Sequence, residues 1–329
     1  MHISPPVLVM SAEKRYNDFL RMRHFVTLND VTTEELHRIL ELATTIKREL
    51  KQGKASAPLA GKVMGMIFEK QSLRTRVSFE IGMHQLGGMA MSLGEDIGKR
   101  EAVKDIAQVL SSMVDVIMFR ALEHKSVSDL AAYSTCPVIN GLTDLAHPCQ
   151  ALSDMLTIYE IFGQLQGIKL AWIGDANNVA ASLLRASAKL GLKMSIAAPD
   201  QFQFDSARVD DLVGTSPVSG FEVERTDDPA KAVQGAHIVY TDVWVSMGQE
   251  NEEADRKRIF TPYQVNEALF SKARSDAVFL HCLPARRGLE VTNEIIDSPQ
   301  SRVVLQAENR LHAQKGLLVW LFNEGCVNN

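Results

Sequence analysis

Short apolar runs alternate with longer amphipathic stretches along most of the chain. Nine of these runs have the length of buried strands: Val63–Phe68, Met89–Leu93, Val116–Phe119 and Val138–Asn140 in the first half, then Ile168–Ile173, Met194–Ala198, Ile238–Thr241, Val278–Leu283 and Val303–Leu305 in the second. Most segments between them repeat apolar residues at helical spacing. This rhythm predicts an α/β fold with two doubly wound domains, each built on a parallel sheet.

The helical stretches differ in how clearly they are marked. Residues Val31 to Lys51 form an amphipathic pattern that Thr32 or Thr33 can cap. A second helix, within Asp144 to Gly163, is expected to bridge the two halves. The stretch from Pro199 to Pro217 is the most loop-like, and the charged residues 249–258 are interpreted as a solvated helix face.

Composition narrows the class of protein. A chain of 329 residues with 46% hydrophobic and 23% charged residues suits two ordinary globular domains. The net charge of −5 argues against nucleic-acid binding, and no apolar run is long enough to span a membrane. The four cysteines are scattered without a CxxC pair, which indicates neither a zinc site nor a disulfide framework and favours the reducing cytoplasm. Residues 1–21, before Met22, are a candidate for a poorly ordered extension.

Polar residues gather where the predicted strands end, which is where doubly wound sheets bind ligands. In the first half these ends carry cations and hydroxyls, and in the second half amides, a carboxylate and a thiol. Ser72 is a good N-cap for a helix whose first turn holds Arg74 and Arg76, an arrangement that favours a bound anion. The alternative is a pair of surface arginines tied to acidic neighbours. Arg120, at another strand end, favours the anion site.

Three other sites in the sequence can be interpreted either as structural or as functional. His147 could be a packed histidine, and it has no ligand partner at metal spacing. Cys282 is a poor candidate for a nucleophile, because the adjacent His281 should point to the opposite face of the strand. Residues 174–178 invite a dinucleotide-binding reading, with Asp200 as the acidic partner. Only the first glycine of that motif is present, so a nicotinamide-dependent dehydrogenase remains a weaker alternative.

Five motifs in order resemble the aspartate/ornithine carbamoyltransferase family, and within it the enzymes that use ornithine. They are Ser72–Arg76, His147–Gln150, Asp242–Gly248, His281–Pro284 and Glu308–Arg310. The resemblance runs from about residue 23 to residue 327. It implies transfer of the carbamoyl group of carbamoyl phosphate to the side-chain amine of L-ornithine, which gives L-citrulline and phosphate in arginine biosynthesis.

The resemblance also implies an organisation. Residues 1–155 would bind carbamoyl phosphate, residues 156–310 would bind ornithine, and residues 311–329 would form a helix that packs back on the first domain. Family members are homotrimers or multiples of trimers with each active site at a subunit boundary. They need neither a metal nor an organic cofactor.

The same resemblance assigns site residues. Those expected to hold carbamoyl phosphate are Ser72, Leu73, Arg74, Thr75, Arg120, His147, Gln150, Cys282, Leu283 and Arg310. Those expected to hold ornithine are Asn178, Asp242, Ser246 and Met247. The catalytic set within them is Arg120, His147, Asp242, Cys282 and Arg310.

Two positions depart from the family pattern. Leu73 stands where a threonine is usual, and Asp96 stands near the place of a glutamine that reaches a neighbouring subunit. A large apolar residue at the first position also occurs in relatives that use acylated ornithine. An acceptor such as a modified ornithine or a diamine therefore remains an alternative, as does a relative that binds its ligands without turnover.

Overall fold

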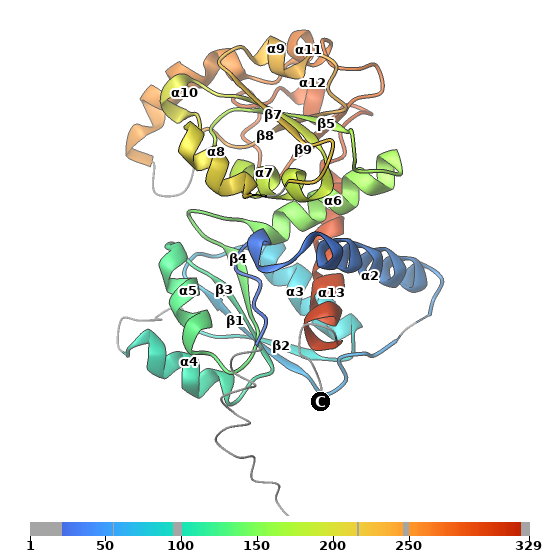
Figure 1. Ribbon diagram of the computed structural model, residues 1–329, viewed down its shortest axis with the longest axis vertical. Helices are drawn as coiled ribbons and strands as arrows, with labels where there is room; N and C mark the ends of the chain where they lie inside the picture. The colour runs from blue at the N-terminus through green and yellow to red at the C-terminus, as the bar shows by residue number, and fades with distance from the viewer. Residues whose placement is uncertain (1–21, 55, 95–100, 216, 246–249, 324–329) are drawn as a thin grey trace, which may run out of the picture.

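The computed structural model describes residues 22–54, 56–94, 101–215, 217–245 and 250–323. The predictions on residues 1–21, Asp96, Ser246 and Met247 lie outside these ranges. Within them the chain forms two parallel sheets stacked along the long axis of the molecule, the first below and the second above in Figure 1. No helix in the described ranges is both long and apolar enough to cross a membrane.

The first sheet has the strand order β2-β1-β3-β4, with all neighbours parallel. Its strands are β1 (Val63–Phe68), β2 (Met89–Ser92), β3 (Val116–Arg120) and β4 (Val138–Leu142). Alternation along β1 sends Met64 and Met66 into one core cluster and Ile67 into another. Helices cover both faces: α2 (Thr33–Lys51) and α3 (Leu73–Gln85) on one, α4 (Val103–Ser111) and α5 (His124–Tyr133) on the other. Thr32 caps α2, as one of the two predicted caps.

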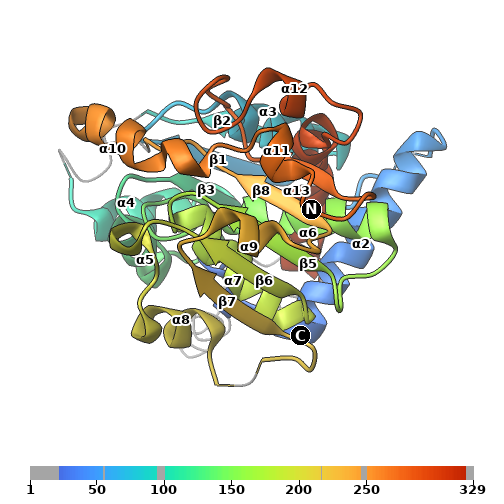
Figure 2. The same cartoon turned by 90° about the horizontal axis from the view of Figure 1, so that it is seen from above.

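The second sheet has the strand order β7-β6-β5-β8-β9, again fully parallel. Its strands are β5 (Lys169–Ile173), β6 (Lys193–Ala197), β7 (Glu222–Thr226), β8 (Ile238–Thr241) and β9 (Val278–His281). On one face lie α7 (Asn178–Leu190) and α8 (Ser206–Val213). On the other lie α9 (Pro229–Val233), α10 (Glu253–Phe260), α11 (Glu267–Phe270) and α12 (Asn293–Ile296), and Figure 2 shows these layers from above.

Two helices join the halves. Helix α6 (Pro148–Phe162) lies between the sheets, and α13 (Val303–Asn323) leaves the second sheet and packs against α2, α3 and α6 (Figure 1). Gly316 permits the close crossing of α13 over α2, because a Cβ there would meet the Ile39 carbonyl oxygen at 2.5 Å. The predicted α/β class, the two parallel sheets and the return of the C-terminal helix are therefore confirmed.

Four local predictions need correction. Val303–Leu305 is the first turn of α13 and not a strand. Strand β7 was not predicted, because it is a polar edge strand with no buried residue. The loop-like stretch after Pro199 contains the 3-10 turn Asp200–Phe202 and helix α8. The charged segment 249–258 does contain helix, but Arg256 within it is buried and not solvated.

Candidate active site

A cavity of about 420 Å³ opens between the carboxyl ends of the two sheets. From the first half it is lined by the predicted residues Ser72, Leu73, Arg74, Thr75, Arg120 and His147. From the second half come the predicted residues Asn178, Asp242, Cys282, Leu283 and Arg310. Gln150 does not line the cavity and lies behind Arg310. Sequence reasoning missed Lys70 and Arg286, two further cations that line it.

The N-terminus of α3 opens into this cavity. Ser72 has extended backbone angles and caps the helix, and its hydroxyl oxygen accepts from the Thr75 amide at 3.4 Å. No acidic side chain occupies the first turn, so the positive end of the helix stays unneutralised. The two predicted arginines separate here. Arg74 lines the cavity, whereas Arg76 lies over the Phe68 ring, 5.2 Å from its centre.

Three arginines from distant parts of the sequence converge on the cavity. Arg74 comes from α3, Arg120 from the end of β3 and Arg310 from α13. Burial, together with the positive charges of Arg310 and Arg74, lowers the pKa of Arg120 to about 10. No salt bridge to Arg74 or Arg310 occurs among the described residues. Arg310 is buried and Arg74 and Arg120 are half-buried. This concentration of positive charge suits a phosphate dianion.

His147 faces these arginines as a neutral imidazole. Burial lowers its pKa well below the usual range, and the charges of Arg310, Arg120 and Arg74 act in the same direction. Its backbone amide donates to the Ser182 hydroxyl at 2.8 Å, which fixes the N-terminus of α6 against α7. A neutral histidine beside a cationic group can donate one hydrogen bond to a carbonyl oxygen without carrying charge.

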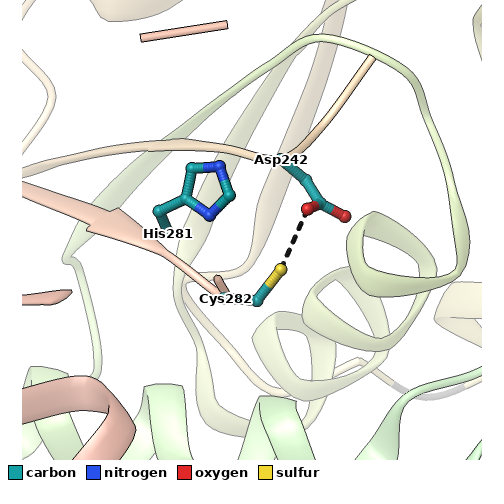
Figure 3. A group of neighbouring side chains, drawn as sticks. All are labelled: Asp242, His281 and Cys282. Atoms are coloured by element: carbon teal, nitrogen blue, oxygen red, sulfur yellow. Dashed lines mark hydrogen bonds between the residues drawn. The ribbon is translucent and has the colours of Figure 1, made fainter. Parts of the chain in front are cut away.

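Asp242 holds the opposite wall of the cavity, directly after β8. One carboxylate oxygen accepts from the Asn177 amide at 2.9 Å, and the other accepts from the Cys282 thiol at 3.0 Å (Figure 3). Burial raises the pKa of Cys282 well above its usual value, and the negative charge of Asp242 raises it further. The thiol therefore stays protonated and acts as a hydrogen-bond donor, in line with the expectation that it is not a nucleophile.

Potential ligand atoms of Asp242, His281 and Cys282 lie within 4.8 Å of one another. His281 is nevertheless engaged elsewhere. Its Nδ1 accepts from the Leu283 amide at 2.9 Å, and its Nε2 lies 3.3 Å from a carboxylate oxygen of Glu290. Both ring nitrogens are thus used, which fixes the tautomer with its proton on Nε2. These hydrogen bonds fix the backbone beside Cys282. They leave neither ring nitrogen of His281 available for a metal ion, so the three residues fit a hydrogen-bonded cluster better than a metal centre.

Neighbouring asparagines at the start of α7 have separate tasks. Asn178, the predicted ligand for ornithine, donates to the Thr143 carbonyl oxygen of the first half at 2.6 Å while lining the cavity. Asn177 was missed. It caps α7 through its side-chain oxygen and uses its amide nitrogen to hold Asp242. An asparagine pair before a helix was the available signal, because only the first can be the cap.

Arg256 was also missed. Its guanidinium is 3% exposed, donates to the Trp244 carbonyl oxygen at 2.6 Å and pairs with Asp175. The same group lies over the rings of Phe202 and Phe260, at 4.5 and 5.4 Å from their centres. These contacts fasten α10 to the segment that follows Asp242. The buried cation Arg256 therefore stabilises the segment that follows Asp242. It was not predicted because it lies in a charge-rich stretch that was interpreted as solvated.

Comparison with known proteins agrees with this geometry. Residues 23–160 match the model of the carbamoyl-phosphate-binding domain of aspartate/ornithine carbamoyltransferases, and residues 166–321 match that of their aspartate/ornithine-binding domain. The ornithine carbamoyltransferase of Anoxybacillus flavithermus is 52% identical over 305 residues, which cover 92% of this chain and 97% of the relative.

A second relative is the ornithine carbamoyltransferase of Pyrococcus furiosus, described as anabolic, which is 50% identical over 90% of this chain and 95% of its own length. Its solved structure superposes with a TM-score of 0.86 and covers 90% of this chain and 96% of that one. An acetylornithine transcarbamylase solved with acetylcitrulline is more distant, at 29% identity and a TM-score of 0.81, over 91% of this chain and 99% of that one. The chain therefore belongs to the aspartate/ornithine carbamoyltransferase family.

Proposed function

We propose that this enzyme transfers the carbamoyl group of carbamoyl phosphate to the side-chain amine of L-ornithine, with L-citrulline and phosphate as products. The observation that carries the proposal is the cavity itself, in which the arginines Arg74, Arg120 and Arg310 face the carboxylate Asp242. The arginines suit a doubly charged phosphate, and the carboxylate suits an α-ammonium group. The relative described as anabolic supports a role of the reaction in arginine biosynthesis.

The donor is held by the first half of the chain. The phosphate lies at the N-terminus of α3, where Ser72, Thr75, the Leu73 amide and Arg74 supply donors. The carbamoyl carbonyl oxygen faces Arg120, Thr75 and His147. Gln150 and Arg310 fix the carbamoyl group from behind. Leu283 directs its carbonyl oxygen toward the reacting amine.

Catalysis follows from charge. The ornithine amine attacks the carbamoyl carbon, a C–N bond forms, and the C–O bond to phosphate breaks. Negative charge grows on the carbonyl oxygen, where Arg120 and neutral His147 stabilise it. The amine must first lose a proton, because such amines titrate near ~10.4 in water. The cationic cavity favours the neutral amine, and the departing phosphate accepts a proton from the nitrogen.

The acceptor is held by the second half. Asp242 pairs with the α-ammonium group, Asn178 with the α-carboxylate, and Ser246 and Met247 complete the pocket for the aliphatic chain. Cys282, as a neutral donor already turned toward Asp242, orients the reacting amine without carrying charge. An acyl group on the α-nitrogen would remove the charge that Asp242 binds, which disfavours the modified-ornithine alternative.

Citrulline formation by purified protein tests the whole proposal. Carbamoyl phosphate and ornithine should yield citrulline and phosphate in equal amounts, with no nicotinamide cofactor present. Formation of citrulline would exclude both the dehydrogenase alternative and a silent relative. If the folded protein binds both ligands and forms no citrulline, the proposal is wrong.

We extend the proposal to a homotrimer. Leu73, Val77 and Ile81 recur at helical spacing on α3 and are 75%, 47% and 41% exposed. Leu73 also lines the active-site cavity. Met89 and Met91 on the edge strand β2 add to the exposed apolar surface. A second copy packed there would bury apolar groups next to the donor site. Light scattering should give three chains, and a fully active monomer would contradict this assembly.

We also propose a cytoplasmic location and a division of the chain into residues 1–155, 156–310 and 311–329. Helices α6 and α13 both cross between the sheets, so each proposed boundary lies within or beside a continuous helix. Cys149 and Cys282 are thiols and not disulfides, which is typical of a reducing compartment. Limited proteolysis between the two halves would test the boundaries.

A further inference from the structure

A carboxylate that takes no part in this mechanism lies behind the active-site cavity. Asp154 is fully buried on α6, one helical turn after Gln150. Among the described residues, no lysine or arginine donates to it. A buried carboxylate without an ion-pair partner is costly, and burial raises the pKa of Asp154 to about 7. Such a group is expected to have a role that offsets its cost.

The contacts of Asp154 point toward Arg310. The Gln150 amide nitrogen donates to a carboxylate oxygen of Asp154 at 2.8 Å. The other end of the same amide, its oxygen, accepts from the Arg310 guanidinium at 2.9 Å. Turning the amide over would place its nitrogen against the donors of Arg310 and its oxygen against the carboxylate. The orientation of Gln150 is therefore determined by both neighbours.

Arg310 is consequently held by neutral amides. With its amide turned to satisfy its surroundings, Gln314 also accepts from the Arg310 guanidinium, at 3.1 Å. A glutamate in place of Gln150 would neutralise Arg310 and face Asp154 at a repulsive distance. The neutral spacer leaves the full positive charge of Arg310 directed at the cavity, while its position is fixed from behind.

Asp154 also contacts the second half of the molecule. The Gln306 amide donates to it at 2.7 Å, and the Tyr240 hydroxyl on β8 donates to it at 3.2 Å. Gln306 in turn accepts from the backbone amide of His281 on β9 at 2.9 Å. The carboxylate therefore joins α6, α13 and the two strands that carry the acceptor-side residues.

We infer that Asp154 is a positioning residue, which fixes the amide of Gln150 and through it sets the guanidinium of Arg310 against the carbamoyl end of the donor. This inference rests on the proposed function. It adds a residue that touches no substrate and was not among the predicted site residues. Phosphate recognition at the N-terminus of α3 should depend on it much less. Ser72 and Arg74 have no hydrogen bond to Asp154 among the described residues, and the hydrogen bond of Arg310 to this end of α3 is a long one, to the Thr75 hydroxyl at 3.4 Å.

The test compares two probes that share a phosphate-like group. Phosphonoacetamide carries a phosphonate and a carboxamide, whereas inorganic phosphate lacks the carboxamide. In Asp154→Ala, phosphonoacetamide should bind about tenfold more weakly in calorimetric titrations, and phosphate should bind within about twofold of wild type. A general structural defect would weaken both probes equally, and that result in a folded variant would overturn the inference.

Two further variants separate geometry from charge. Asp154→Asn keeps an oxygen that accepts from Gln150, so it should restore phosphonoacetamide binding. Tyr240→Phe removes a different neighbour of Asp154 and should leave that binding unchanged. Failure of Asp154→Asn in a folded protein would contradict positioning through Gln150.

A double-mutant cycle tests whether Asp154 acts on donor binding through Gln150. Gln150→Met removes the amide, and adding Asp154→Ala to it should weaken phosphonoacetamide no further. Additive losses would show that Asp154 acts by another route and would overturn the inference. If Asp154→Ala does not fold, Asp154→Asn and the apolar pair Gln150→Met with Asp154→Leu carry the same test. Citrulline formation by wild type is measured in parallel, so that a failure of the proposed function is distinguishable.

Discussion

The two walls of the active-site cavity are built on opposite electrostatic plans. On the donor side, Arg74 and Arg310 approach the cavity with no carboxylate bound to either in the ranges the structure describes. On the acceptor side, the carboxylate of Asp242 is already surrounded by donors from Asn177, Cys282 and its own loop. The donor side presents arginine charges that no described carboxylate neutralises. The acceptor side presents a carboxylate that already accepts hydrogen bonds from the protein.

This difference implies different contributions of the two sides to substrate affinity and substrate selectivity. An anion that enters the donor side gains contacts to Arg74, whose guanidinium has no hydrogen bond to another described residue. A ligand for Asp242 must match or replace contacts that already exist, so only a group with the right charge and geometry gains by binding. We therefore expect the donor wall to supply binding strength and the acceptor wall to discriminate among amines.

Acceptor choice should show the largest effect. Ornithine should exceed acetylornithine, putrescine and aspartate in kcat/KM by a factor on the order of 10⁴. Acetylornithine leaves Asp242 without a charged partner and putrescine leaves Asn178 without one, whereas aspartate has no side-chain amine to accept the carbamoyl group. Steady-state assays at saturating carbamoyl phosphate measure this ratio. Comparable values for acetylornithine or putrescine would refute the assignment of the acceptor wall and leave carbamoyl transfer intact.

Removing one donor-side arginine should come next. Arg74→Ala should cost about 2–5 kcal/mol in kcat/KM for carbamoyl phosphate, because a buried charge interaction is lost. Arg76→Ala is the matched control, since Arg76 lies two residues away on the same helix and does not line the cavity. Equal losses in the two variants would mean that the donor wall is misplaced.

The reactivity of the Cys282 thiol tests its contact with Asp242 on the acceptor side. Burial and Asp242 raise the pKa of Cys282, so iodoacetamide should modify this thiol slowly at pH 8. Asp242→Asn removes the negative charge and should accelerate modification about tenfold, which mass spectrometry of the peptide would measure. Buried Cys149 serves as the internal control. Rapid modification of Cys282 in wild type would contradict a protonated thiol held by Asp242.

The smallest expected effect lies at Leu73. Leu73→Thr adds a hydroxyl beside the phosphate position and should tighten carbamoyl phosphate by about 0.5–1.5 kcal/mol if one hydrogen bond is gained. Affinity is measured by titration and stability by thermal unfolding, since the exposed leucine also contributes to the proposed subunit contact. Unchanged or weaker donor binding in a folded variant would exclude a side-chain role at this position.

The fold was largely predictable because buried parallel strands are nearly continuous apolar runs. Strand β7 was not predicted because it is an edge strand, which pairs on one side only, and its sequence from Glu222 to Thr226 contains a single apolar residue, Val223. Val303–Leu305 misled because three β-branched or apolar residues fit a strand as well as a helix. Val304 is 77% exposed there, whereas Val303 and Gln306 face inward at helical spacing.

The cavity was predictable to the extent that its residues follow strands or start helices. Arg120, His147 and Asp242 were found by that rule. Asp154 and Arg256 were not, because each acts from within a helix and has a partner distant in sequence, Gln306 for Asp154 and Asp175 for Arg256. Sequence position identified residues that line the cavity, but a supporting hydrogen-bond network depends on tertiary contacts that no local pattern encodes.

Helix α13 has a consequence for how the protein is made. Its 21 residues span about 30 Å, and its distal half places Leu317, Leu318 and Trp320 in the core shared with α2 and α3. The first sheet therefore lacks part of its cover until α13 has left the ribosome. We expect the nascent first half to remain incomplete until then, and a nonsense codon ahead of α13 to damage the part of the protein that was translated first.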